Sequence, residues 1–258
     1  MKKWLSAAAV VVAIGIGTLY YYFFSAMSVD GTTQYVYIDD DDNIDSVLTK
    51  VSAVSNAHAM SAYTLLAKHS AYAEHVRTGR YAINGSNGAL VSFRHMKNGL
   101  QTPINLTVPS VRTTDRLAAE LSKKLMLDSA AISHALKDEA VCQKYGYDTA
   151  TIACMFIPNT YDIYWNTSID HLFERMQKES KRFWNAERTK KAADMKLSTV
   201  QVITLASIID EETANNDEKP MVAGMYYNRL MLRNAEYPNG MPLQADPTIK
   251  LSLIHISE

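Results

Sequence analysis

Three acidic side chains stand next to one another at the end of an apolar run, in the segment "LASIIDEETANND". Asp210, Glu211 and Glu212 could each donate or accept a proton. Consecutive residues of a helix point about 100° apart, however, so the three cannot serve one site. Ser198 followed by Gln201 is a capping-box signature and predicts that a helix begins just before this run. The orientation of that helix therefore decides which carboxyl group can do chemistry.

A helical wheel with Val202 at 0° distinguishes the three acids. The predicted buried stripe consists of Val202, Leu205, Ala206 and Ile209. Asp210 falls near about 80° and Glu211 near about 180°, which is the solvent side, whereas Glu212 falls near about 280°, at the edge of the stripe. A carboxylic acid kept partly out of water can stay protonated and donate its proton near neutral pH. The pattern thus selects Glu212 as a general acid, and the alternative is that the helix simply ends there with Glu212 solvated.

The N-terminus predicts a membrane anchor. Lys2 and Lys3 are followed by a stretch without charge from Trp4 to Met27, which ends in the aromatic run "YYYFF" before Ser25. About 20 helical residues cross a hydrocarbon core of ~30 Å, and aromatic residues are typical of the membrane interface. A cleaved signal peptide, the alternative, would have a shorter apolar core and a small-residue cleavage site. We therefore expect an uncleaved anchor at residues 4–27, residues 1–3 in the cytoplasm, and the rest of the chain outside, which in a bacterium is the periplasmic side of the inner membrane.

Composition excludes several classes of function. The chain has 258 residues and a net charge of −1, with 26 basic and 27 acidic side chains, so no field that attracts nucleic acid is expected. Seven His and two Cys show no metal-binding spacing, and we predict neither a metal site nor a cofactor. Cys142 and Cys154 flank a loop in a compartment that permits disulfides, which predicts a structural bridge; two buried free thiols are the alternative.

The alternation of elements predicts an α+β fold. Residues 32–108 show the pattern strand, helices, strand, helix, strand, which indicates a small α+β module, and the chain is largely helical from residue 109 onward. "DDDDN" precedes a helical run, and acids there are favoured by the helix dipole. The basic stretch at residues 178–191 is interleaved with Glu, which is typical of a solvated helix face.

Several motifs in a fixed order resemble those of the endolytic murein transglycosylase, or YceG-like, family. They are the acid-bearing helix at residues 206–213, the segment "YNRL" at residues 227–230 and the segment "MPLQADPT" at residues 241–248. The upstream "FIPNTYDIYWNTS" resembles another segment of the family, with Pro158, Thr160 and Tyr161 as its weaker candidates. "GRYAI" resembles a strand of the family's LysM-like subdomain. The resemblance implies a single transmembrane helix, a LysM-like subdomain at residues 30–108 and a mainly helical catalytic domain at residues 109–258.

The resemblance implies cleavage of the MurNAc–GlcNAc β-1,4 bond of nascent peptidoglycan, leaving 1,6-anhydro-MurNAc ends. In the family, the catalytic Glu immediately precedes a Thr, and it corresponds to Glu212, the residue that the helical wheel selects. Polar side chains at family motif positions are candidates for shaping the site or binding sugar: Asn228, Gln244, Asp246 and Thr248. For each of these, a contact that stabilises a turn is the alternative, and Asp246 could equally cap a helix. The implied partners are glycan strands, the membrane and cell-wall synthesis proteins.

Two other functions remain open at this point: a non-catalytic glycan-binding scaffold and a muramidase-type hydrolase. The chain ends shortly after the D-P-T motif, whereas the family's catalytic domain continues, and residues from about Ser252 do not look like the expected continuation. We therefore expect a C-terminally truncated catalytic domain, possessing its acid but not the whole of its cleft.

Overall fold

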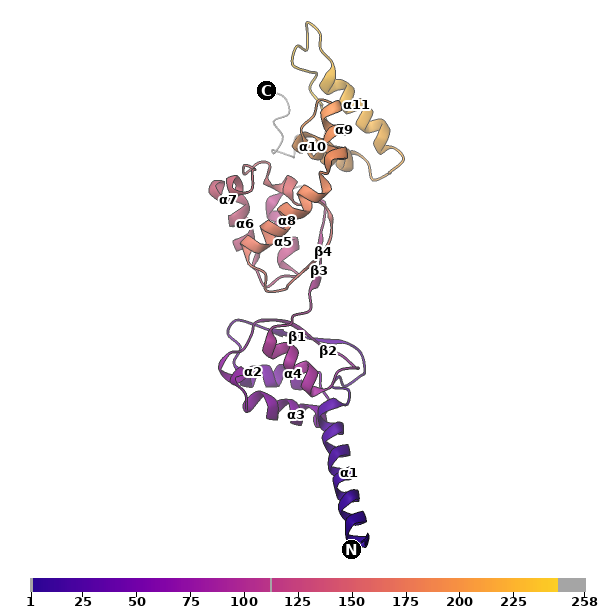
Figure 1. Ribbon diagram of the computed structural model, residues 1–258. Helices are drawn as coiled ribbons and strands as arrows, with labels where there is room; N and C mark the ends of the chain where they lie inside the picture. Colours follow the sequence, from indigo (N-terminus) through magenta and orange to yellow (C-terminus); the bar gives the residue numbers. More distant parts are fainter. Residues whose placement is uncertain (1, 112, 246–258) are drawn as a thin grey trace. The chain divides into compact units, whose positions relative to one another are not determined.

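The computed structural model describes residues 2–111 and 113–245 (Figure 1). The chain divides into two compact units: unit 1 comprises Met1–Ile104 and Asp162–Asn166, and unit 2 comprises Asn105–Tyr161 and Thr167–Glu258. The fold is mixed α+β and mostly helical, with small sheets, as the sequence predicted. The sequence placed the boundary between residues 108 and 109, whereas the structure places it after Ile104 and returns a short later segment to unit 1.

Unit 1 packs helices against a two-stranded sheet. Its elements are α1 (Lys2–Phe24), β1 (Gln34–Ile38), α2 (Ile44–Ser52), α3 (Ala57–Lys68), η1 (Ala71–Glu74), β2 (Gly79–Ile83) and α4 (Ala89–Asn98). Strands β1 and β2 are antiparallel, with Val36 opposite Tyr81. Helix α4 ends at Gly99, which takes the left-handed conformation (φ 68°) that glycine adopts without strain. The strand "GRYAI" is where the sequence predicted it.

Helix α1 contains an apolar stretch, Ala7–Phe24, that is long enough to cross a membrane and is not buried by the rest of the chain. A signal sequence shares these properties. The helix ends at Phe24, and Met27, which the sequence placed in the anchor, is fully buried in the core of unit 1. The last part of the predicted anchor therefore belongs to the globular unit.

Unit 2 contains the remaining helices and most of a second two-stranded sheet, whose residues Ile104, Asp162 and Ile163 belong to unit 1. Its elements are β3 (Ile104–Val108), α5 (Thr114–Ser122), α6 (Ser129–Lys137), α7 (Glu139–Lys144), η2 (Ile152–Met155), β4 (Asn159–Ile163), α8 (Ile169–Phe183), α9 (Ala186–Asp194), α10 (Thr199–Glu212) and α11 (Lys219–Met231). The Thr113 side chain caps the start of α5. The helical stretch at residues 168–195 divides into α8 and α9, because the Asn185 side chain caps a new helix. Helices α9 and α10 then meet at 78°.

Candidate active site

The helix that carries the acids begins at the predicted capping box. It ends at Glu212, which is exposed, and this ending was the alternative to a helix that continues past the acid. The Ser198 hydroxyl accepts from the Gln201 backbone N–H at 3.1 Å, and the Gln201 side chain accepts from the Ser198 N–H at 2.8 Å. These two bonds satisfy backbone donors that would otherwise lack partners in the first turn. Glu212 is the last residue of α10, and Thr213 is its C-cap.

The buried face of α10 is rotated from the predicted one. The buried residues are Leu205, Ile208 and Ile209, which fall near about 300°, 240° and 340° on the wheel. Ala206, predicted to be buried, is exposed. The rotation arises because α11 packs against one face of α10 while η2 contacts another, whereas the wheel assumed a single partner. As a consequence Glu212, near about 280°, lies in line with the centre of the stripe rather than at its edge.

Glu212 is tied to α11 by one hydrogen bond. The Tyr226 hydroxyl donates to Glu212 Oε1 at 2.7 Å, and Tyr226 itself is only 3% exposed. Glu212 lies at the exposed end of the apolar contact between the two helices. One oxygen of the Glu212 carboxyl is thus held by the buried Tyr226 hydroxyl. Glu212 itself is exposed to solvent, so a large substrate can reach it. The sequence did not identify Tyr226; its only signal was its place directly before the "YNRL" motif.

The two neighbouring acids have different surroundings. Asp210 forms an ion pair with Lys219 at 2.5 Å, which joins the end of α10 to the start of α11. The sequence placed Glu211 in solvent, but the structure places it half-buried. The reason is again the double packing of α10: a residue near about 180° on the wheel lies between the α11 face and the η2 face.

The loop between α10 and α11 is ordered by its own side chains. The Thr213 hydroxyl donates to Glu218 Oε2 at 2.8 Å, and the Asn215 side-chain amide donates to Glu218 Oε1 at 3.1 Å. The Thr213 hydroxyl also accepts from the Asn215 backbone N–H at 3.0 Å. This network fixes the chain directly after Glu212.

A third segment packs against the α10–α11 pair. Leu243 and Ala245 are buried in the same apolar cluster as Tyr226. Arg229 holds this segment twice: its guanidinium donates to the Leu243 carbonyl, and its backbone carbonyl accepts from the Met241 N–H at 3.0 Å. Arg229 belongs to the "YNRL" motif, but in that motif only Asn228 was predicted to lie in the site.

Gln244 lies between these two buried residues, and its side chain is exposed. Its φ is 52°, in the left-handed region that a residue with a side chain seldom adopts. Such backbone strain persists only where the surroundings enforce it, and it concentrates at functional sites. The structure therefore brings the Gln244 segment to the helix pair that carries Glu212.

The other predicted sugar-binding residues are not joined to Glu212 in the described part of the chain. Asn228 is exposed, and it lies about 200° around α11 from Tyr226, on the face away from α10. The role of Asn228 in shaping the site or binding sugar stays a prediction. Asp246 and Thr248 lie outside the described residues.

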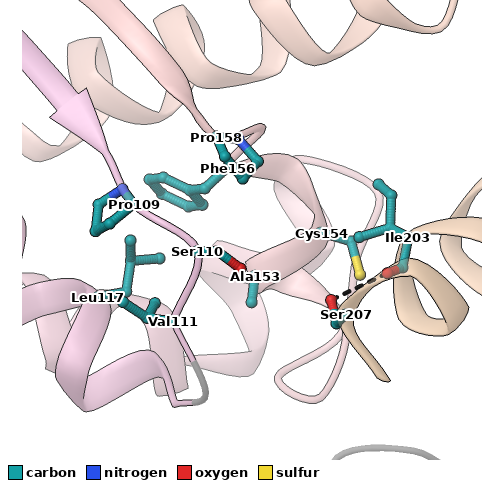
Figure 2. Close-up of a pocket in the computed structure, with 10 residues that line it drawn as sticks. All are labelled: Pro109, Ser110, Val111, Leu117, Ala153, Cys154, Phe156, Pro158, Ile203 and Ser207. Atoms are coloured by element: carbon teal, nitrogen blue, oxygen red, sulfur yellow. Dashed lines mark hydrogen bonds between the residues drawn. The ribbon is translucent and has the colours of Figure 1, made fainter. Parts of the chain in front are cut away.

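A pocket of about 90 Å³ lies on another face of α10 (Figure 2). Ile203 and Ser207 form one wall, with the Ser207 hydroxyl donating to the Ile203 carbonyl at 3.0 Å. Cys154 lies beside them, and Pro109 and Leu117 lie on the other side of the pocket (Figure 2). On the wheel this wall is about 160° from Glu212. The pocket is mainly lined by apolar groups and does not include the candidate acid.

The predicted disulfide is absent, because both cysteines are free thiols. Cys142 is buried beside α6, where its Sγ donates to the Leu136 carbonyl at 3.5 Å. Cys154 instead lines the pocket against α10. Burial raises the pKa of the Cys154 thiol, which a hydrogen bond with Thr204 only partly offsets. The structure thus contains two free thiols, of which only Cys142 is buried, and a bridge in the native compartment stays a prediction. In the described residues, no group of three or more His, Cys, Asp or Glu could hold a metal ion.

Comparisons with known proteins identify distant relatives of this chain. An endolytic murein transglycosylase of Bacillus subtilis (strain 168) is 29% identical over 84 residues, which cover 33% of this chain and 21% of that protein. The enzyme of the same description from Streptococcus pneumoniae (serotype 2 strain D39) is 24% identical over 236 residues, 80% of this chain and 40% of that protein. This chain therefore spans less than half the length of these curated relatives.

A crystal structure of a yceG-like protein from Listeria monocytogenes is 21% identical, with a TM-score of 0.49, and the match covers 88% of this chain and 77% of that one. The sequence profile of the YceG-like family matches residues 36–256, which is most of the chain. The chain therefore belongs to the YceG-like family.

Proposed function

We propose that this protein is a membrane-anchored endolytic murein transglycosylase in which Glu212 is the sole general acid and base. The observation that carries the proposal is the Glu212 carboxyl, held at 2.7 Å by the buried Tyr226 hydroxyl at the exposed end of the α10–α11 contact. Membership in the YceG-like family and the description of the distant relatives support the same activity.

The reaction needs one carboxyl group used twice. Glu212, protonated, gives its proton to the oxygen that links MurNAc C1 to the next GlcNAc, and that C1–O bond breaks. The MurNAc 6-hydroxyl oxygen then bonds to C1, and its proton passes to the Glu212 carboxylate, which restores the acid. A glycosidase that hydrolyses its substrate requires a second carboxylate as nucleophile or as base for water. No activated water is required here, so a single acid suffices.

The surrounding residues have positioning roles in this proposal. Tyr226 orients one carboxyl oxygen, so that the other can face the glycosidic oxygen. Arg229 fixes the segment that carries Gln244, whose exposed side-chain amide can bind sugar hydroxyl or acetamido groups. Asp246 and Thr248 extend the same segment and remain proposed sugar contacts. Pro158, Thr160 and Tyr161 precede or lie in β4 of unit 2, and we assign them no step.

The location follows from the N-terminus. We propose that α1 stays attached as a single-pass anchor in the inner membrane, with Lys2 and Lys3 in the cytoplasm and the two units on the periplasmic side, where nascent glycan strands lie. Unit 1 would then be the LysM-like, membrane-proximal part, and unit 2 would hold the catalytic residues. A mature N-terminus near residue 28 in protein recovered from cells would contradict the anchor.

The decisive experiment is mass spectrometry of the muropeptides released from peptidoglycan by the purified full-length enzyme and its variants. General acid–base catalysis by one group typically contributes 10²–10⁴-fold, so Glu212→Gln should lose anhydro-product formation by about that factor. Asp210→Asn is the matched control, because it removes a neighbouring charge on the same helix and should retain most of the activity.

Three outcomes separate the alternatives. Near-normal anhydro product from Glu212→Gln, or loss of product from Asp210→Asn, would show that Glu212 is not the acid. Reducing ends in place of anhydro ends would indicate a muramidase-type hydrolase. Glycan binding without any cleavage product by the unsubstituted full-length enzyme would indicate a scaffold.

A further inference from the structure

Direct side-chain contacts join α1 to the rest of unit 1. The His58 ring, near the start of α3, stacks on the Tyr21 ring with centroids 4.2 Å apart and planes inclined by 22°. Its edge also meets the Tyr22 ring at 6.4 Å, and His58 Nε2 lies 2.7 Å from the Ser25 hydroxyl. The final turn of the apolar helix is therefore packed against α3.

Hydrogen bonds hold the segment that directly follows α1. The Asn56 side-chain amide donates to the Ala26 carbonyl at 3.1 Å and to the Ser28 carbonyl at 2.8 Å, just before α3 begins. Met27 is fully buried, and its N–H donates to the Asn87 carbonyl at 3.0 Å. These contacts begin within two residues of the end of α1. Unit 1 is thus joined to α1 without a flexible linker.

The length of α1 sets the depth of this junction in a bilayer. Ala7–Phe24 has 18 residues, or about 27 Å of helix, which is close to the ~30 Å hydrocarbon core. Tyr20–Phe24 at its end is then at the interface, where tyrosine is preferred. Because His58 is in ring contact with Tyr21, it lies at nearly the same depth.

The exposed face of α3 continues this surface. Its exposed residues at helical spacing are Ala57, Ser61, Leu65 and Lys68. Figure 1 shows α3 on the side of unit 1 from which α1 leaves, with β1 and β2 on the other side. Small residues allow close approach, Leu65 is 52% exposed, and a lysine at the end can reach lipid phosphates.

From these contacts we infer that α3 rests on the membrane at headgroup depth, so that the exposed stripe Ala57–Lys68 is a lipid-binding surface. The inference rests on the proposed anchoring by α1. It goes beyond anchoring, because it fixes unit 1 against the bilayer and identifies the face that contacts lipid.

The test uses a fluorophore on single cysteines in the full chain, in nanodiscs whose lipids carry a nitroxide quencher on the headgroup. Cys142→Ala and Cys154→Ala remove the native thiols, and circular dichroism checks that each variant is folded. The label is placed at Ser61→Cys on the α3 stripe, at Tyr37→Cys on β1 as the distal control, and at Leu19→Cys on α1 as the anchor control. We expect strong loss of fluorescence at positions 19 and 61, and little at position 37.

The three labels distinguish failure of the inference from failure of the anchor. Quenching at position 19 with no more quenching at 61 than at 37 would overturn the lipid contact of α3 and leave the anchor intact. Absence of quenching at position 19 would show that α1 is not inserted, which contradicts both.

Discussion

At the scale of single residues, the candidate site depends on a pair that no short motif contains. Glu212 and Tyr226 are 14 residues apart, and their hydrogen bond exists only because the faces of α10 and α11 meet. The sequence identified Glu212 from its neighbours on the same helix. It could not identify Tyr226, because the partner of a buried hydroxyl is set by the packing of two helices. Asn228 shows the reverse case: its motif position was evident, but its face of α11 was not.

The Tyr226 hydroxyl gives a prediction at this scale. Tyr226→Phe retains the buried ring but removes the donor to the Glu212 carboxyl. A hydrogen bond to a charged group contributes about 1.5–3 kcal/mol, so we expect kcat for anhydro-product formation to fall by about 10-fold or more. KM should stay near that of the parent chain, since no sugar contact changes, and the variant should remain folded at the assay temperature because the buried ring is retained. A fall in the unfolding midpoint that accounts for the lost activity would instead indicate a structural role.

At the scale of elements, local signals predicted the ends of helices and strands well. The capping box at Ser198 and the glycine at Gly99 act within a few residues, so they can be recognised without tertiary structure. The predicted buried face of α10 lies about 60° around the helix from the observed one. A helical wheel contains no information on how many elements pack against the helix. The break between α8 and α9 was missed as well, because a single Asn cap interrupts an otherwise helical pattern.

The acidic run before α2 also has a different role from the predicted one. Asn43 caps the helix, while Asp39 and Asp42 both pair with Lys50 in its last turn, at 2.6 Å and 2.5 Å. Burial acts to raise the pKa of Asp42, but hydrogen bonds from Lys50 and Ser46 outweigh it and hold that pKa below its usual 3.8. The run therefore closes a loop onto the helix that follows it.

This pairing predicts a pH-dependent stability. Because the pKa of Asp42 is lower in the folded than in the unfolded protein, its contribution is present above about pH 4 and is lost as the pH falls through the folded pKa. Asp42→Asn should lower the free energy of unfolding by on the order of 1 kcal/mol at pH 7, and the difference from the parent should narrow below pH 3.8. Urea unfolding at pH 7 and pH 3 measures both values. An equal difference at the two pH values would show that the charge of Asp42 does not stabilise this loop.

At the scale of the whole molecule, the contacts of α1, the proposed anchor, make this helix part of a folded unit rather than an appended tail. The sequence predicted the apolar span from its composition, but its contacts with α3 and α4 depend on residues more than 30 positions away. They give the anchor a defined orientation relative to the core of unit 1. The properties of α1 and the stability of unit 1 should therefore respond to the same substitutions.

Gly88 provides the test of that coupling. It precedes α4 with φ −84°, which alanine also adopts, but a Cβ there would lie 2.5 Å from the Phe23 carbonyl oxygen and 2.6 Å from Phe24 Cα. Gly88→Ala must therefore displace the end of α1, and overpacking of this kind typically costs about 1–3 kcal/mol. We expect a lower unfolding midpoint in nanodiscs, together with weaker quenching of a label at position 61 while a label at position 19 stays quenched. Gly17→Ala, in α1, is the matched control, because a Cβ at Gly17 meets nothing within 4 Å. If Gly88→Ala matched Gly17→Ala in both measurements, the end of α1 would not be packed against unit 1 in the bilayer.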